Sequence, residues 1–277
     1  MTMIPRNMRI DFTGVDVHWS KVNPAFSTLI NAGSFSAVPF EIYLNKVMAW
    51  ARDELGGKNP ALHRDINLFI AQEGHHYRVH RGYNKVLLQA YPRAKDYEDE
   101  LGEALRVQFE TRSLLYNLAF CVGFENFACY ISKYQFSKAL PFYEGADRRM
   151  ATLWQWHSAE EFEHRAACSD ALAAISNNYF ARVRGLIVFL KLLLPWQNRL
   201  VGYMLEIDRA GMTEAQIAES KRQKKEADRS LMSFVFPRMT QIFLPFYDPR
   251  RQTAPQALHD ALVDYEKIAA EPRPVAA

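Results

Sequence analysis

Several features that mark other classes of protein are scarce in this sequence. Its three cysteines among 277 residues include no Cys-x-x-Cys pair, which excludes a disulfide framework and a thiolate zinc site. The first twelve residues lack an apolar stretch of signal-peptide length, so we expect a cytoplasmic protein. The most apolar segment, 185–205, is interrupted by Lys191, Pro195 and Arg199, and it falls short of the roughly 18 to 20 apolar residues that span a membrane.

The sequence also lacks a strong excess of charge and any sustained alternation of apolar and polar residues. Its 34 basic and 31 acidic residues give a net charge of +3, which does not point to a nucleic-acid partner. Without period-2 alternation and hairpin turns, β-strands are not expected. The hydrophobic content of 49% is ample for a buried core, and the sequence therefore predicts an all-α protein.

Prolines and glycines divide the chain into long helical runs. We expect residues 1–37 to be irregular and Pro39 to open the first helix. The whole chain, 1–277, is predicted to be one domain, with a core bundle over about 38–178 and accessory helices over about 179–270. The expected helices are 39–56, 60–82 with an extension to Ala90 as the alternative, 97–139 with a break near Gly123, 145–176, 179–194, 196–210, 213–246 with breaks at Pro237 and Pro245, and 255–270, followed by a disordered tail.

Two of these helices carry the motif Glu-x-x-His, at Glu73 to His76 and at Glu161 to His164. Residues three apart project from nearly the same face of a helix, so each pair can present a carboxylate and an imidazole to one point. With 18 glutamates and 8 histidines, roughly half a match is expected by chance. The two motifs alone are therefore only suggestive.

Two further glutamates complete a metal-binding pattern. Glu41 and Glu125 lie among apolar neighbours on the other two core helices, and 32, 52 and 36 residues separate the four successive carboxylates. Short, long and short spacing is typical of two helix hairpins joined by one crossover, as in the ferritin-like four-helix bundle with a dinuclear metal site. Glu110 is a competitor for the role of Glu125, which we favour because its surroundings are almost wholly apolar.

His157 lies one helical turn before Glu161 and is available as a seventh ligand, with a packing role as the alternative. His80 follows His76 by one turn, and we expect it to lie beside the ligands or the pocket. Tyr77 is a second candidate for a place beside them. Carboxylates with imidazoles favour two iron ions, or manganese, or one of each.

The ligand pattern resembles the di-iron N-oxygenases that oxidise aryl amines, in which an additional histidine on the last core helix binds one iron. The resemblance covers about 41–164, and it implies as metal ligands Glu41, Glu73, His76, Glu125, His157, Glu161 and His164.

A second resemblance extends over most of the chain. The stretches Pro39-Phe40-Glu41, Gln72-Glu73-Gly-His-His76, Tyr83-Asn84 and Glu160-Glu161-Phe-Glu-His164 are similar to bacterial proteins described as predicted metal-dependent hydrolases. This resemblance implies the alternative activity, hydrolysis with metal-activated water.

From ligand type we expect an enzyme that activates dioxygen to oxidise a small molecule, such as an amine or a lipophilic compound. The alternatives are a metal-dependent hydrolase on the same bundle and a non-catalytic metal-binding protein. The expected partners of the first class are O2, the substrate and an electron donor. A basic cluster, 221–225, precedes an apolar stretch, 231–246, which suggests peripheral membrane contact, a substrate channel or a homodimer helix.

Overall fold

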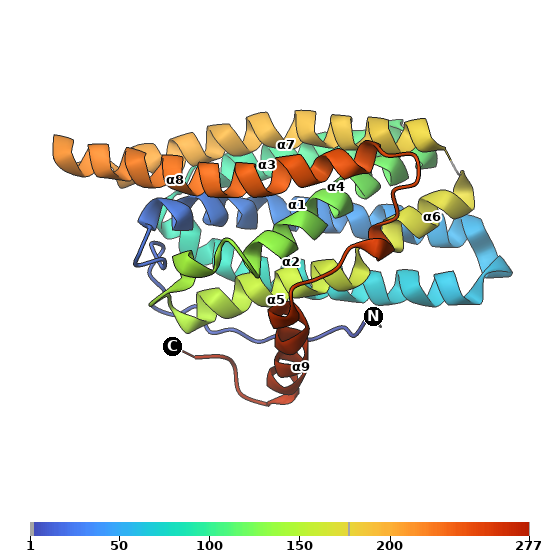
Figure 1. Ribbon diagram of the computed structural model, residues 1–277, viewed down its shortest axis with the longest axis horizontal. Helices are drawn as coiled ribbons and strands as arrows, with labels where there is room; N and C mark the ends of the chain where they lie inside the picture. Colours follow the sequence, from blue (N-terminus) through green and yellow to red (C-terminus); the bar gives the residue numbers. More distant parts are fainter. Residues whose placement is uncertain (1–2, 177, 277) are drawn as a thin grey trace.

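The computed structural model describes residues 3–176 and 178–276. Over these ranges the chain is all-α, as predicted, and its one β-type pairing is an isolated bridge between Ile10 and Val275 (Figure 1). The helices are α1 Pro24–Leu55, α2 Pro60–Ala90, α3 Ala94–Thr111, α4 Leu114–Gln135, α5 Arg148–His164, α6 Ala167–Ile175, α7 Tyr179–Asp208, α8 Glu214–Met239 and α9 Gln256–Ala270.

The start of α1 corrects the expectation that residues 1–37 are irregular. The helix begins at Pro24 because the side chain of Asn23 caps it, accepting a hydrogen bond from the backbone nitrogen of Phe26 at 2.9 Å. Pro39 lies inside the helix, where Val38 before it has no side chain that could cap a new helix. The signal at Asn23 and Pro24 is the same one that correctly placed the start of α2 at Asn59 and Pro60.

Two further helix breaks differ from the predicted positions. The region 97–139 divides at Ser113, whose hydroxyl caps α4, and α4 continues through Gly123. The region 145–176 divides after His164, where the Arg165 side chain donates hydrogen bonds to the carbonyls of Phe162 and Pro249. Both breaks are therefore made by side-chain hydrogen bonds and not by glycine or proline.

The C-terminal region also departs from the prediction. α7 is one helix that contains Pro195, and α8 contains Pro237 and is followed by a short 3-10 turn, Thr240–Phe243. The tail expected to be disordered is pinned instead, because the backbone nitrogen of Val275 donates to the carbonyl of Arg9 at 2.8 Å. Ala277 lies outside the described residues.

Glycine allows α4 and α7 to pack unusually closely. A Cβ atom on Gly185 would lie 1.8 Å from the carbonyl oxygen of Ala119, and one on Gly123 would lie 2.8 Å from the backbone of Gly185. Neither position can accept a side chain without moving the helices apart. The C-terminal helix α7 is thus fitted directly onto the core helix α4.

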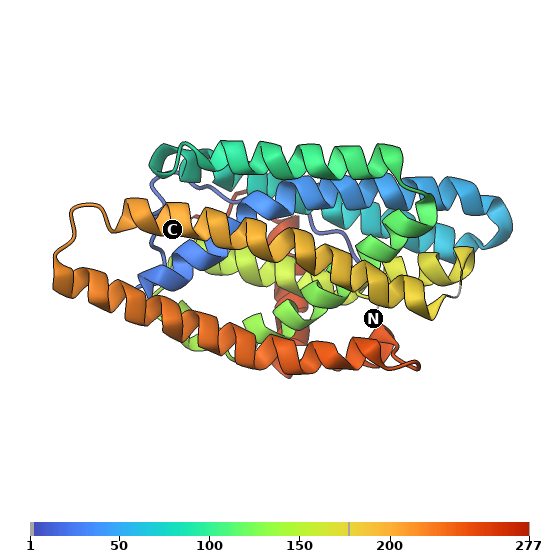
Figure 2. The same ribbon diagram turned by 90° about the horizontal axis from the view of Figure 1, so that it is seen from above.

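The helices that carry the candidate ligands, α1, α2, α4 and α5, lie in contact with one another at the centre of the molecule. Figure 2 shows α7 and α8 running across the face formed by α1 and α4, while α9 packs on α5 from the other side (Figure 1). α4 is the one helix in the described part of the chain that is long and apolar enough to cross a membrane. Its position explains that composition, since 72% of the apolar stretch is buried inside the protein.

Candidate metal centre

All seven candidate ligands project into one interior region of the bundle. Their side chains are 0–4% exposed, apart from that of His157, which is 12% exposed. α1 supplies Glu41, α2 supplies Glu73 and His76, α4 supplies Glu125, and α5 supplies His157, Glu161 and His164.

The ligand atoms form two adjoining groups that share His76 and Glu161. Glu41 and His157 complete the first group, Glu73 and His164 complete the second, and within each group the atoms lie within 4.8 Å of one another. Glu125 joins the second group, because its Oε2 atom lies 3.0 Å from Nδ1 of His164. Each of the two groups has a spacing of ligand atoms that could hold a metal ion.

Several of these buried atoms have no hydrogen-bond partner among the described residues. Both carboxylate oxygens of Glu41 and both of Glu73 are unpartnered, as are Oε1 of Glu125, Oε2 of Glu161, Nδ1 of His76 and Nε2 of His164. Buried polar atoms normally have partners, and an isolated buried carboxylate is costly. Unpartnered carboxylate oxygens gathered at one place are what a bound metal ion would satisfy.

A chain of hydrogen bonds sets the tautomer of His157. The hydroxyl of Ser34 donates to Oδ1 of Asn84 at 2.6 Å, so Nδ1 of His80 must donate to the Ser34 oxygen, 2.8 Å away. Burial, with the nearby imidazole of His157, holds the pKa of His80 well below its usual value, so His80 is neutral. Its Nε2 atom therefore accepts the Nδ1 proton of His157 across 2.6 Å.

The lone pair of His157 consequently points at carboxylates. Its Nε2 atom lies 2.9 Å from Oε1 of Glu161 and 3.5 Å from Oε1 of Glu41. Burial lowers the pKa of His157, which favours the neutral ring, and in that form two acceptors face each other at these distances. A cation between them would turn this repulsion into ligation.

The pKa values of the carboxyl groups depend on their burial and on the charged groups beside them. Burial raises the pKa of Glu41 well above its usual value, and the charges of the other carboxylates raise it further. Burial raises the pKa of Glu125 to about 8, against the opposing effect of the His164 imidazole. Burial has the same tendency at Glu161, but there the neighbouring histidines prevail and lower the pKa to about 2. Without a cation, the region therefore holds protons on some carboxyl groups at neutral pH.

The pKa values of His76 and His164 are raised, whereas those of His80 and His157 are lowered. Burial alone would lower the pKa of His76, but the carboxylates of Glu160 and Glu73 raise it to about 9. The carboxylates of Glu125 and Glu161 likewise raise the pKa of His164 to about 10. A metal ion that binds here must displace these protons.

Glu160 and Arg6, which the sequence did not single out, form a layer behind His76. Oε2 of Glu160 lies 3.0 Å from Nε2 of His76, and the guanidinium of Arg6 donates to Oε1 of Glu160 at 3.1 Å. Arg6 also donates to Glu163 at 2.9 Å, which in turn accepts from Gln72 at 2.7 Å. A carboxylate on the far nitrogen of a histidine orients the ring and raises its basicity toward a metal.

The remaining candidates are placed as follows. His80 contacts His157, as described above, whereas Tyr77 lies outside the cluster with the guanidinium of Arg81 5.3 Å from its ring centroid. The competitor Glu110 is about half exposed and forms an ion pair with Arg106 at 2.5 Å. The structure therefore brings Glu125, and not Glu110, to the other ligands.

An apolar cavity of about 200 Å³ leads from this region toward the surface. Glu41, His157 and Glu161 form its inner end, and its remaining walls come from α1, α4, α5, α7 and α8. Its apolar lining includes Phe40, Phe124, Phe127, Trp154, Phe189 and Val235. The C-terminal helices thus line the access route to the candidate ligands.

Comparison with protein families shows to which family the chain belongs. A family model described as "predicted metal-dependent hydrolase" matches residues 4–253. The chain belongs to this family. Neither a comparison with curated proteins nor one with solved structures found a match.

The match to the predicted metal-dependent hydrolase family covers α1 to α8 and every candidate ligand. Among the reaction classes that the sequence left open, the family description supports the hydrolase alternative better than oxygen activation. Within the family assignment, the buried cluster of glutamates and histidines is the part of the molecule suited to hold a metal.

Proposed function

We propose that the seven clustered side chains hold two metal ions, and that the protein is an enzyme acting on a small apolar molecule in the adjoining cavity. The observation that carries this proposal is the pair of adjoining buried groups of glutamates and histidines, in each of which the candidate ligand atoms lie within 4.8 Å of one another. The unpartnered oxygens of Glu41 and Glu73 support it. A protein interior tolerates such an arrangement only when a cation compensates it.

The donor set fits iron or manganese best. Four carboxylates and three imidazoles form a ligand set of oxygen and nitrogen donors that is rich in oxygen. None of the three buried cysteines is among the clustered groups. Glu41 and His157 would hold one ion, Glu73, Glu125 and His164 would hold the other, and His76 and Glu161 belong to both groups. We propose on the same grounds that α1, α2, α4 and α5 form a ferritin-like bundle, because the order and spacing of these ligands match that arrangement.

Hydrolysis is the first candidate reaction, since the family description supports it. When bound, two such metals would supply either Lewis-acid activation of water or electrons for the reduction of O2. In either reaction Glu160 would orient His76, and the Ser34 to His80 chain would keep the His157 lone pair on the metal side. The apolar cavity walls would bind the substrate and exclude bulk water from it.

Oxygen-dependent oxidation is the second candidate. The donor set favours it because imidazoles and carboxylates suit redox-active iron and manganese, and the largely apolar cavity suits a substrate that is oxidised away from bulk water.

One experiment separates the two reactions. The protein is loaded with ferrous iron under anaerobic conditions, tested on a panel of apolar esters and amides, and then exposed to O2 in a stopped-flow spectrometer. Hydrolysis without O2 supports the first candidate, whereas rapid O2 consumption with a transient absorbance change supports the second. A protein that binds neither ferrous ion nor, in a parallel loading, manganous ion would contradict both.

A further inference from the structure

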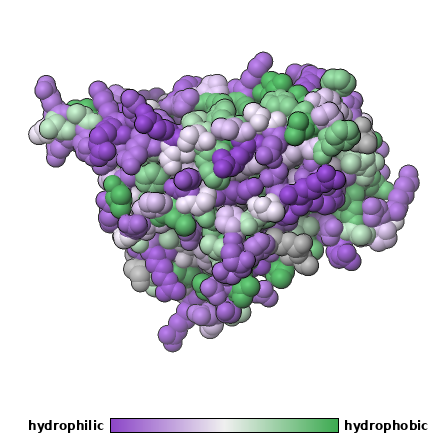
Figure 3. Space-filling view, in the orientation of Figure 1, coloured by the Kyte–Doolittle hydropathy of each residue, from purple (hydrophilic) through white to green (hydrophobic). Residues whose placement is uncertain are grey.

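Large apolar side chains gather at one end of the molecule, where α7 begins and α8 ends. Figure 3 shows hydrophobic side chains over this end of the upper face. Four of them form what we call the apolar tip, and their exposed fractions are unusually large for such residues. They are Phe180 at 78%, Phe243 at 43%, Leu244 at 57% and Phe246 at 87%. Exposed apolar patches of this kind mark interaction surfaces.

Hydrogen bonds fix the two halves of the apolar tip to each other. The hydroxyl of Tyr179 donates to the carbonyl of Phe243 at 2.7 Å. The guanidinium of Arg182 donates to the carbonyls of Leu244 at 2.6 Å and Tyr247 at 3.0 Å. Segments about sixty residues apart in sequence are thereby held together with their apolar side chains outward.

The two segments that build this end contain no carboxylates. Neither 179–205 nor 229–247 has an aspartate or glutamate, although the whole chain has 31. Both segments carry cations, namely Arg182, Arg184, Lys191, Arg199, Arg229 and Arg238. Apolar side chains flanked by cations without anions favour a surface that is both apolar and negatively charged.

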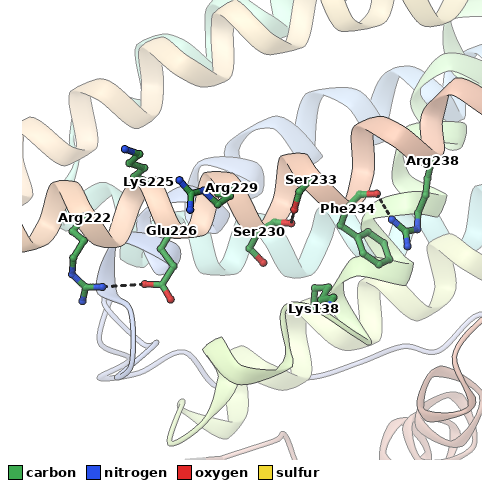
Figure 4. A pocket seen from close by; sticks show the side chains of 9 residues that line it. All are labelled: Lys138, Arg222, Lys225, Glu226, Arg229, Ser230, Ser233, Phe234 and Arg238. Atoms are coloured by element: carbon green, nitrogen blue, oxygen red, sulfur yellow. Dashed lines mark hydrogen bonds and ion pairs between the residues drawn. The ribbon is translucent and has the colours of Figure 1, made fainter.

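A basic groove along α8 extends the positive charge. Figure 4 shows Arg222, Lys225, Arg229 and Arg238 along α8, with Lys138 on the neighbouring segment across the groove. Arg222 pairs with Glu219 and Glu226, but Lys138, Lys225 and Arg229 have no ion-pair partner in the described part of the chain. Two uncompensated cations, Lys225 and Arg229, therefore lie on the helix that leads to the apolar tip, and a third, Lys138, lies across the groove from them.

α8 also connects this surface with the cavity. Met232 and Phe236 line the cavity and are 40% and 39% exposed, so the cavity reaches the surface between the basic and the apolar parts of α8. A lipophilic molecule leaving an apolar phase at this end would meet the cavity entrance.

We propose that the apolar tip and the cations of α7 and α8 dock on the surface of a bilayer rich in anionic lipid, and that the cavity takes its lipophilic substrate from that bilayer. Docking is independent of the metal centre, whereas the supply of substrate rests on the proposed function. The charge pattern favours this occupant over a second copy of the chain, because two copies would bring like charges together.

Vesicle flotation of the full-length, metal-loaded protein tests the docking. We expect binding to vesicles with about a quarter phosphatidylglycerol and at least tenfold weaker binding to pure phosphatidylcholine. The double variant Phe180→Ser with Phe246→Ser should bind the anionic vesicles at least about tenfold more weakly. The control is Val263→Ser, an equally simple change of a 56% exposed residue on α9, which should bind as wild type does.

A second double variant tests how much the cations of α8 contribute to vesicle binding. Lys225→Gln with Arg229→Gln should weaken binding about fivefold per residue and reduce its dependence on salt. Wild-type protein that stays with the buffer, or that forms a dimer which the Phe180 and Phe246 substitutions dissociate, would overturn the proposal. Metal content measured on the same samples keeps the two proposals apart, since a metal-free protein that still floats would contradict only the proposed function.

Discussion

Replacing Glu41 by leucine should stabilise the metal-free protein and reduce the stabilisation that metal binding adds. The Glu41 side chain is fully buried, neither of its oxygens has a hydrogen-bond partner, and burial and the nearby carboxylates hold its pKa well above the usual value. Without a cation this buried carboxyl group destabilises the folded protein. With a cation bound it becomes a ligand.

The size of both effects can be worked from the structure. Removing an unsatisfied buried polar group should stabilise the metal-free protein by about 1–3 kcal/mol. For a chain of this size that corresponds to a rise in Tm of about 2–10 °C. Losing one ligand should weaken metal binding, and a site saturated at about 100 times its Kd contributes about 2.7 kcal/mol to the free energy of unfolding. The stabilisation that metal adds to the metal-free protein should therefore be smaller in the variant than in the wild type, by up to about 2.7 kcal/mol per ion.

Thermal unfolding of wild type and Glu41→Leu, each with chelator and with excess ferrous or manganous ion, measures both effects. The control is Glu110→Leu, because Glu110 is about half exposed and its ion pair contributes little. Its free energy of unfolding should change by no more than about 0.5 kcal/mol under both conditions. If Glu41→Leu destabilised the metal-free protein, or if metal raised the Tm of variant and wild type equally, the reasoning would be refuted.

The remaining predictions concern packing, ligands and pH. Gly185→Ala should destabilise the protein by at least about 1–3 kcal/mol in urea unfolding, since its Cβ would overlap Ala119 of α4, whereas Gly202→Ala on the same helix meets nothing within 4 Å and should be neutral or stabilising. Glu160→Gln should lower metal affinity about 10- to 100-fold in competition titrations without changing the stoichiometry, and unchanged affinity would contradict its contact with the His76 ligand. His157→Ala should retain two metals while altering reactivity, and loss of both metals would show that His157 is required for metal binding. Metal affinity should rise between about pH 6 and pH 9, because the raised pKa values of the centre mean that metal must displace protons, and an affinity that is flat over this range would count against the cluster as the metal site.

The composition of the cluster could be predicted because it depends on local geometry. Glu73 and His76, or Glu161 and His164, share a helix face whatever the rest of the chain does. Apolar neighbours favoured Glu125 over Glu110, and the structure buries Glu125 beside His164, since a carboxylate among phenylalanines needs a partner. Helical register and burial pattern are both present in a single sequence.

The layer behind the ligands could not be predicted in the same way. Arg6 meets Glu160 across 154 residues, and no local pattern links an irregular N-terminal segment to the fifth helix. The only available signal was a third carboxylate in the apolar run around Glu161, which requires a compensating cation somewhere. Helix breaks at Ser113 and Arg165 were missed for a related reason, because hydrogen bonds of polar side chains are weaker sequence signals than proline or glycine.

The C-terminal helices were read as accessory, and their role emerges only from packing. α7 meets α4 through glycine on both sides, and α7 and α8 complete the cavity walls. We propose that they belong to the same folding unit as the core. A single cooperative unfolding transition that Gly185→Ala shifts as a whole would support this, and two separate transitions would contradict it.

The most direct measurement of the central claim is a crystal structure of protein loaded with iron or manganese, with anomalous scattering recorded at both absorption edges. The account predicts two anomalous peaks within ligand distance of the cluster, one beside Glu41 and His157 and the other beside Glu125 and His164. A cluster without any peak, or metal bound elsewhere on the chain, would contradict it.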